Sequence, residues 1–218
     1  MKKPNEKNLP NRLLEHDQIF LSQGFKSLAG VDEAGRGPLA GPVVASAVIV
    51  RDFSFDHPVN DSKKLTPRQR ERAFEEILRK CWVGIGVVEH HVIDQINILQ
   101  AAMRAMEEAV RKLPENPDMV LIDGPSLPGI GVCPQTPIID GDAKSFSVAC
   151  ASVAAKVTRD RMMDYYDQVY PVYGFAKHRG YGTPEHLDAL KKFGPCRIHR
   201  RTFEPVRSMI GRYENIIY

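Results

Sequence analysis

Three apolar runs of this chain lead into carboxylates, and these acids have the clearest chemical potential. The first run ends in the adjacent pair Asp32 and Glu33, and the second, Met119–Ile122, ends in Asp123. Asp142 follows a short β-branched segment just ahead of a long helical pattern. Taken singly, each acid is more often an ordinary strand-end or helix-capping residue. A buried acid with no partner costs several kcal/mol, so the recurrence favours a functional site.

Four such carboxylates suit hard divalent cations. Mg²⁺ and Mn²⁺ prefer oxygen ligands in octahedral geometry, and a pair of them roughly 4 Å apart can promote phosphodiester hydrolysis. No Ser-His-Asp order or Cys-His pair stands out. The scattered histidines are not predicted to be metal ligands; they are His90, His91, His178, His186 and His199. The pattern alone leaves open whether the four acids converge.

A glycine-rich turn directly follows the first acid pair. Gly35, Arg36 and Gly37 permit close backbone approach, and turn amides and carbonyls can bond a hydroxyl. Such a turn can read the ribose 2′-hydroxyl that separates RNA from DNA. Without the acids, an ordinary turn is the simpler interpretation. Tyr181, in a second glycine-rich stretch, can stack on a sugar or base, although a lone tyrosine is more often surface or partial core.

Basic residues gather in the C-terminal part of the chain. Net charge is only +3, yet residues 176–212 hold nine Lys and Arg against three Asp and Glu. We predict phosphate contacts, which position a duplex without reading sequence, for Lys63, Lys64, Arg200 and Arg201, with Arg36 as a further candidate. A solvated charged face explains the charge alone equally well.

The composition is typical of a soluble globular protein: 43% of the 218 residues are hydrophobic and 26% are charged. The four cysteines form no CxxC pair, which disfavours zinc and a disulfide framework. No signal peptide and no apolar run of 18 residues is present. We therefore expect a cytoplasmic protein without a membrane span, and a monomer.

Hydrophobic periodicity predicts a mixed α/β fold, whose strand order it leaves open. The expected strands are Leu28–Asp32, Val43–Val50, Trp82–Glu89, Met119–Asp123 and Pro137–Asp140. The expected helices are Asn11–Gln23, Thr66–Lys80, Ile93–Leu113, Ser145–Tyr170, Pro184–Phe193 and a last one from Arg207, with Tyr173–Thr183 irregular. We predict an N-terminal extension over 1–27 and one catalytic domain over 28–218, helical from about residue 184.

The segment from Gly30 to Val43, GVDEAGRGPLAGPV, resembles the signature of ribonuclease HII. Further similarity follows in the family's order over nearly the whole chain, roughly Leu28 to Arg207. It includes DSKKL at 61–65, IDQINIL at 93–99, LIDG at 121–124, AKVTRD at 155–160, HRGYGT at 178–183 and HRRTF at 199–203.

This resemblance implies a ribonuclease H-like fold, with a mixed central sheet of about five strands flanked by helices and a helical C-terminal part. It implies that Asp32, Glu33, Asp123 and Asp142 form the acidic site for Mg²⁺ or Mn²⁺. It also implies that the Gly35–Gly37 turn and Tyr181 read the ribose at an RNA-to-DNA junction. The expected substrates are RNA–DNA hybrids and duplex DNA containing ribonucleotides, cut to 5′-phosphate and 3′-hydroxyl ends.

Three alternative interpretations compete with ribonuclease HII. Ribonuclease HIII resembles this family but carries an extra N-terminal domain, for which about 27 residues before the first strand leave no room. A non-catalytic nucleic-acid-binding module would not need all four acids. A different two-metal nuclease on the same fold would not need a ribose reader. The tail Ser208–Tyr213 resembles a sliding-clamp peptide only faintly, because the usual glutamine is missing.

Overall fold

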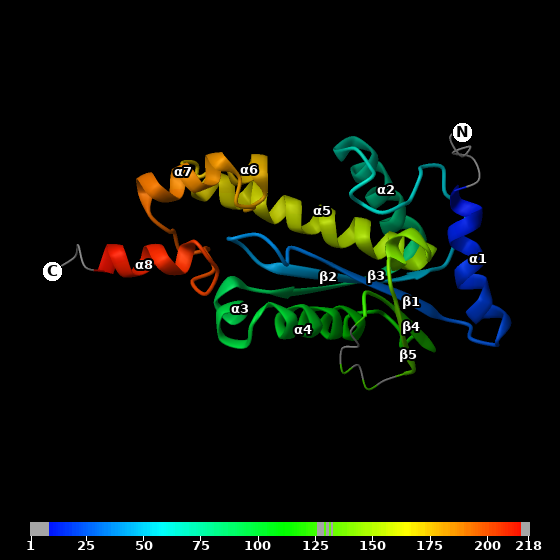
Figure 1. Cartoon of the computed structure of the whole chain (residues 1–218). Helices are drawn as coiled ribbons and strands as arrows, with labels where there is room; N and C mark the ends of the chain where they lie inside the picture. The colour runs from blue at the N-terminus through cyan, green and yellow to red at the C-terminus, as the bar shows by residue number, and fades with distance from the viewer. Residues whose placement is uncertain (1–8, 126–128, 130, 132, 215–218) are drawn as a thin grey trace, which may run out of the picture.

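The computed structural model describes residues 9–125, 129, 131 and 133–214, and it is built around a five-stranded sheet (Figure 1). The strand order is β3-β2-β1-β4-β5. Strands β1, β2 and β3 pair antiparallel, whereas β4 and β5 add in parallel beyond β1. The strands are β1 (Leu28–Ala34), β2 (Val43–Val50), β3 (Cys81–Val88), β4 (Met119–Asp123) and β5 (Gln135–Ile138). The expected mixed sheet of five strands is confirmed.

Helices cover both faces of the sheet (Figure 1). On one face lie the long helix α5 (Phe146–Val169) and α2 (Pro67–Lys80); on the other lie α3 (His90–Ile96) and α4 (Ile98–Arg111). A 3-10 turn, η2 (Gly141–Ala143), leads from β5 into α5, and α6 (Phe175–His178), α7 (Pro184–Phe193) and α8 (Val206–Glu214) form the C-terminal part. No helix in the described ranges is long and apolar enough to cross a membrane.

Strand β1 is the centre of the sheet, and α5 packs against it closely. A Cβ on Gly30 would lie 2.1 Å from the backbone carbon of Ser147, so only glycine permits this approach. The predicted strand ended at Asp32, but β1 continues to Ala34, with Asp32 opposite Ser46 and Ala34 opposite Val44 on β2. The acid pair is therefore held inside the ladder rather than in the following turn.

The prediction of one helix over Ile93–Leu113 is wrong, because Asn97 divides it into α3 and α4. Asn97 adopts φ 66°, and its side-chain oxygen accepts hydrogen bonds from the amides of Leu99 and Gln100 at 3.0 and 3.1 Å. Asparagine tolerates positive φ and caps helix N-termini well. These capping hydrogen bonds separate α3 from α4, although the apolar pattern continues across Asn97.

The N-terminal helix α1 (Leu9–Ser22) is attached to the start of α5 through a buried acid. Asp17 is 2% exposed; it accepts hydrogen bonds from the Ser145 hydroxyl at 2.5 Å and the Ser147 amide at 2.9 Å. Both donors stand at the start of α5, where a carboxylate complements the helix dipole. The boundary at residue 27 stays a prediction.

Candidate active site

The parallel pairing of β1 and β4 brings the first three acids to the same end of the sheet. Val31 on β1 lies opposite Ile122 on β4, so the next residues along each strand are Asp32 and Asp123. The turn η2 adds the fourth acid, because the Gly141 amide donates to Asp123 Oδ1 at 2.6 Å and Asp142 follows it. The sequence-predicted acids therefore gather around one strand end.

Asp32 is the most deeply buried of the four, with 6% of its surface exposed. Burial, followed by repulsion from Glu33 and Asp123, raises the pKa of Asp32 well above its usual range. Burial also raises the pKa of Glu33, while Arg36, whose Nη1 lies 3.2 Å from Glu33 Oε1, opposes this and Asp123 adds to it. The carboxylates are thus close enough to repel one another.

A fifth acid, Asp61, joins the group beside Asp142. Burial raises the pKa of Asp142 to about 6, and both Asp61 and Asp123 contribute by repulsion. Lys63 partly offsets this charge, with its ammonium 3.9 Å from Asp142 Oδ2. Although partial burial opposes it, attraction from Asp142, Asp61, Asp32 and Asp123 raises the pKa of Lys63. Lys63 therefore lies at the acidic site, while Lys64 is exposed and faces Asp61 at 3.6 Å.

The donor set fits divalent cations by its chemistry. Within the described residues, no three His, Cys, Asp or Glu side chains already form a metal-holding group. The carboxylates nevertheless repel one another in a partly buried setting, where Arg36 and Lys63 offset part of their charge. Added cations would offset this repulsion and the cost of burying the carboxylates.

The buried side chain of Arg200 supports the turn between β1 and β2 by binding its backbone carbonyls. The guanidinium of Arg200 is fully buried and donates to the carbonyl oxygens of Gly35, Arg36, Gly41 and Pro42 at 2.5, 2.8, 3.0 and 3.2 Å. Burial lowers the pKa of Arg200 to about 9. Its donors face backbone carbonyls instead of solvent. The phosphate contact predicted for Arg200 is therefore corrected to a role in shaping the turn; Arg201 beside it is exposed.

A second buried arginine, Arg159 on α5, supports the same turn and was not among the predicted site residues. It donates to the carbonyls of Pro42, Ala40 and Arg179 at 3.0, 3.1 and 3.1 Å. Gly35 has φ +99°, and a Cβ there would lie 2.1 Å from Arg159 Nε. A signal existed: Arg159 stands four residues from both Ala155 and Met163, which are buried on the same face of α5.

Tyr181 lies beside the glycine-rich turn, as the ribose-reading interpretation requires. Its side chain is 46% exposed, and its Cε1 lies 3.5 Å from where a Cβ on Gly37 would stand. The Leu39 amide donates to the Gly180 carbonyl at 2.8 Å and links the two segments. Two stretches far apart in the sequence thus form one surface next to the acids.

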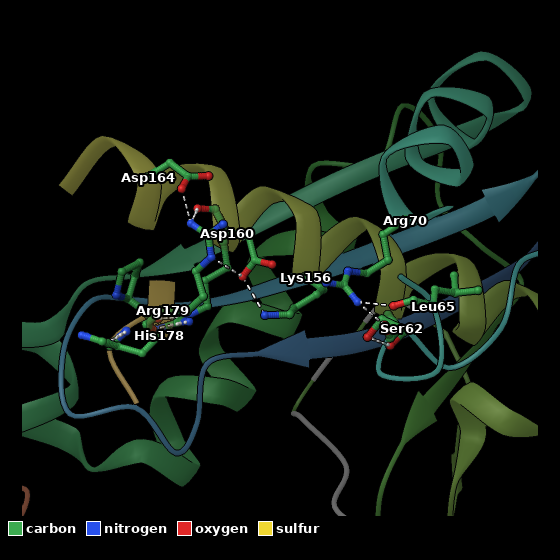
Figure 2. Close-up of polar contacts among 12 residues, drawn as sticks. Ser62, Leu65, Arg70, Lys156, Asp160, Asp164, His178 and Arg179 are labelled. Carbon is green, nitrogen blue, oxygen red and sulfur yellow. Dashed lines mark hydrogen bonds and ion pairs between the residues drawn. The ribbon is translucent and has the colours of Figure 1, made fainter. Parts of the chain in front are cut away.

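Helix α5 contacts both the segment around Arg179 and the segment around Ser62, and Figure 2 shows the polar contacts around these residues. In its C-terminal half, Arg179 donates to the carbonyl of Asp160 at 3.0 Å and to the carboxylate of Asp164. Lys156, near the middle of the helix, donates to Asp160 Oδ1 at 2.6 Å. At its N-terminal half, Ser152 donates to the hydroxyl of Ser62 at 3.0 Å. The tyrosine loop and the Lys63 segment are therefore held on a common helix.

The family model described as Ribonuclease HII matches residues 29–206. The chain belongs to the ribonuclease HII family. Ribonuclease HII of Geobacter sulfurreducens is 54% identical over 191 residues, which cover 87% of this chain and 87% of that protein.

Solved structures agree with the family and the fold. The ribonuclease H2 of Pyrococcus horikoshii OT3 matches with a TM-score of 0.73 at 29% identity, over 87% of this chain and 99% of that one. The Archaeoglobus fulgidus chain from a structure of its PCNA:RNase HII complex matches with a TM-score of 0.72 at 26% identity, over 82% and 96%. The ribonuclease H-like fold is thereby confirmed.

Membership of the ribonuclease HII family makes this chain an RNA-degrading nuclease and supports endoribonuclease activity on RNA–DNA hybrids. The matched range 29–206 nearly coincides with the similarity expected over Leu28 to Arg207. It includes all four acids, the glycine-rich turn and Tyr181.

Proposed function

We propose that this ribonuclease HII cuts the RNA strand of RNA–DNA hybrids and also cuts 5′ of single ribonucleotides in duplex DNA. The products are a 5′-phosphate and a 3′-hydroxyl, and the cofactors are two divalent cations, Mg²⁺ or Mn²⁺. One observation carries the proposal: Asp32, Glu33, Asp123 and Asp142 gather at one end of the sheet, directly beside the Gly35–Gly37 turn that Arg200 supports and Tyr181 contacts.

Asp32, Glu33, Asp123 and Asp142 would hold the cations. When bound, the cations supply Lewis-acid stabilisation of charge on the phosphate and its leaving oxygen. The protein's own part is to keep the acids in place: the Glu33 amide donates to Asp32 Oδ1 at 2.7 Å, and the Gly141 amide holds Asp123. Lys63 is placed beside Asp142 to contact a substrate phosphate as a point charge.

The Gly35–Gly37 turn and Tyr181 would recognise the ribose. Gly37 and Arg36 are exposed, while the carbonyls behind them are satisfied by Arg200, so the outer face of the turn remains available. The Tyr181 ring, next to Gly37, can stack on a sugar or base. Arg36, Lys63, Lys64 and Arg201 are exposed and can contact duplex phosphates without reading sequence.

Cleavage of a defined duplex tests the proposal. Duplex DNA carrying one ribonucleotide is incubated with Mg²⁺ or Mn²⁺, and the ends are mapped on a sequencing gel. We expect a single cut on the 5′ side of the ribonucleotide, no cut in the all-DNA duplex, and no cut by Asp123→Asn. Equal cleavage of the all-DNA duplex, or a cut dependent on neither metal nor Asp123, would sink the proposal.

Tyr181→Ala is expected to lower kcat/KM on the single-ribonucleotide duplex by roughly ten- to a hundredfold, because the ring that positions the ribose is lost. Metal affinity, measured by calorimetry with Mn²⁺, should stay unchanged, since the residue contacts none of the four acids in the proposed arrangement. Tyr181→Phe separates stacking from hydrogen bonding. A loss of metal affinity in Tyr181→Ala would contradict the role.

A sliding clamp is proposed as a protein partner. The support is the Archaeoglobus relative, whose structure was solved as a PCNA complex. In this chain the tail Ser208–Tyr213 falls within α8, of which side chains are described only as far as Ile210.

A further inference from the structure

Three histidines that are far apart in the sequence form a buried cluster behind the tyrosine loop. His178, His186 and His199 are 8%, 0% and 1% exposed. The rings of His178 and His186 stack at 4.5 Å and 14°, and the Nε2 atoms of His186 and His199 lie 3.0 Å apart. The ribose-reading and metal-binding roles proposed above use none of these groups.

The hydrogen bonds select one proton arrangement for His186 and His199. The Cys196 amide donates to His199 Nδ1 at 2.9 Å, so that nitrogen is an acceptor and the proton of a neutral ring is on Nε2. His199 Nε2–H then donates to His186 Nε2, which leaves the proton of His186 on Nδ1. That proton points to the carbonyl oxygen of Tyr181, 2.9 Å away.

The opposite arrangement fits less well. A proton on His199 Nδ1 would face the Cys196 carbonyl at the longer distance of 3.3 Å and would confront the Cys196 amide hydrogen. His186 would then carry its proton on Nε2 and present a lone pair to the Tyr181 carbonyl, placing two acceptors 2.9 Å apart. The Cys196 amide and the Tyr181 carbonyl therefore select the same tautomers of the two rings.

His178 holds the neighbouring residue of the same loop. The Gly180 amide donates to His178 Nδ1 at 3.2 Å, and His178 Nε2 donates to the Tyr173 carbonyl at 2.7 Å. Imidazoles thus bind the backbone of both Gly180 and Tyr181. The Thr183 amide completes the loop by donating to the Tyr181 carbonyl at 2.8 Å.

We propose that His186, oriented by His199, is a positioning residue that sets the Tyr181 ring against Gly37 by donating from Nδ1 to the Tyr181 carbonyl. The inference rests on the proposed function, because it assigns Tyr181 the ribose. A lost or reversed donor would release the loop and move the ring away from the glycine-rich turn. His186 contacts the loop backbone and not the substrate, so it acts through Tyr181.

His186 and His199 must both be neutral for this hydrogen-bond arrangement to form. Burial, then neighbouring histidine charge, lowers the pKa of His199 to about 3; burial with repulsion from His178 lowers that of His186 to about 4, although the bond to the Tyr181 carbonyl opposes it. The titratable and charged groups around the rings are His178 from α6, His90 from α3, and Tyr173, Cys196 and Arg200 from the flanking loops.

The sign of the pH dependence follows from these lowered pKa values. Protonating His186 on Nε2 would put two N–H donors opposite each other at the 3.0 Å contact with His199, and protonating His199 on Nδ1 would put a second donor opposite the Cys196 amide at 2.9 Å. Both folded pKa values lie below the ordinary value of about 6.5, so the pair stabilises the fold fully above that pH. This stability is lost as pH falls through about 4 and about 3.

A double-mutant cycle tests whether His186 acts through Tyr181. Asn keeps a donor near the position of Nδ1, whereas Gln places its amide near Nε2. We expect His186→Gln to lower kcat/KM on the single-ribonucleotide duplex roughly tenfold, and His186→Asn to retain most activity. In a Tyr181→Ala background, His186→Gln should cost less than about twofold, since coupled residues are not additive. Equal losses in both backgrounds, or equal losses for Asn and Gln, would overturn the positioning role.

A second measurement needs neither a variant nor activity. Nitrogen-15 NMR of the wild-type protein at pH 7 reports the tautomer of each imidazole. We expect Nδ1–H for His186 and Nε2–H for His199, and the reverse pattern would overturn the proposal. If the wild-type enzyme fails to cut at the single ribonucleotide, the proposed function fails while the tautomers remain as predicted; if it cuts but the cycle is additive, only the positioning role fails.

Discussion

Asp32→Asn is expected to lower hydrolysis of an RNA–DNA hybrid by about a thousandfold or more and, at the same time, to make the folded protein more stable. The activity falls because a neutral amide is a poor cation ligand in place of a buried carboxylate. Stability rises because burial and the charges of Glu33 and Asp123 penalise the ionised form of Asp32. The asparagine oxygen can still accept the Glu33 amide hydrogen that Asp32 Oδ1 accepts at 2.7 Å.

Thermal unfolding in EDTA and gel-based cleavage with Mg²⁺ measure the two effects separately. Asp188→Asn is the matched control, because the Asp188 side chain is 74% exposed and lies far along the chain on α7. It should change neither quantity appreciably. Near-normal cleavage by Asp32→Asn would remove Asp32 from the cation site, and a lower Tm would contradict the electrostatic account.

Arg200→Met is expected to lower the free energy of unfolding by about 3 kcal/mol or more, since unpaired buried polar groups cost roughly 1–3 kcal/mol each. The carbonyl oxygens of Gly35, Arg36 and Gly41 lose this donor when the guanidinium is removed, whereas that of Pro42 keeps its hydrogen bond from Arg159. For a chain of this size, such a loss lowers Tm by about 10 °C. Cleavage at single ribonucleotides should fall as well, because Gly35 and Arg36 belong to the proposed ribose reader.

Arg201→Met is the natural comparison, since Arg201 is the next residue and is exposed. Its Tm should stay close to that of the wild type. If Arg201 contacts a phosphate, the variant binds the hybrid more weakly at low salt and shows a shallower dependence of affinity on salt concentration. An Arg200→Met protein with wild-type Tm but weak, salt-insensitive binding would restore the phosphate contact first predicted for Arg200.

Much of the fold followed from local patterns. The β-branched run Val43–Val50 is a strand with the predicted bounds, and Thr66–Pro67 begins α2 with the expected N-cap and proline. Local patterns failed where a side chain competed with the backbone. Asn97 broke an apolar stripe that otherwise read as one helix, because its side chain caps α4 while its own backbone turns to positive φ.

The glycines of the β1–β2 turn could be predicted from the sequence, whereas the arginine that supports them could not. Gly35 and Gly37 were identified from the sequence because glycine at a strand end suggests close approach or unusual φ. The role of Arg200 in supporting this turn could not be identified from the sequence, because Arg200 and Arg201 are adjacent residues of the same type. One is buried among carbonyls and the other is exposed. Only the path of the chain around Ala40 and His199, which form a β-bridge, separates them.

The sequence therefore determined which acids could form the site. Their convergence was decided by the tertiary structure. Apolar runs that end in Asp32, Glu33 and Asp123 place carboxylates at or near strand ends whatever the sheet order. The parallel pairing of β1 with β4, and the hydrogen bond from Gly141 to Asp123, decide that these acids and Asp142 meet. Periodicity records which side of an element is buried, but strand neighbours are chosen by packing across the whole sheet.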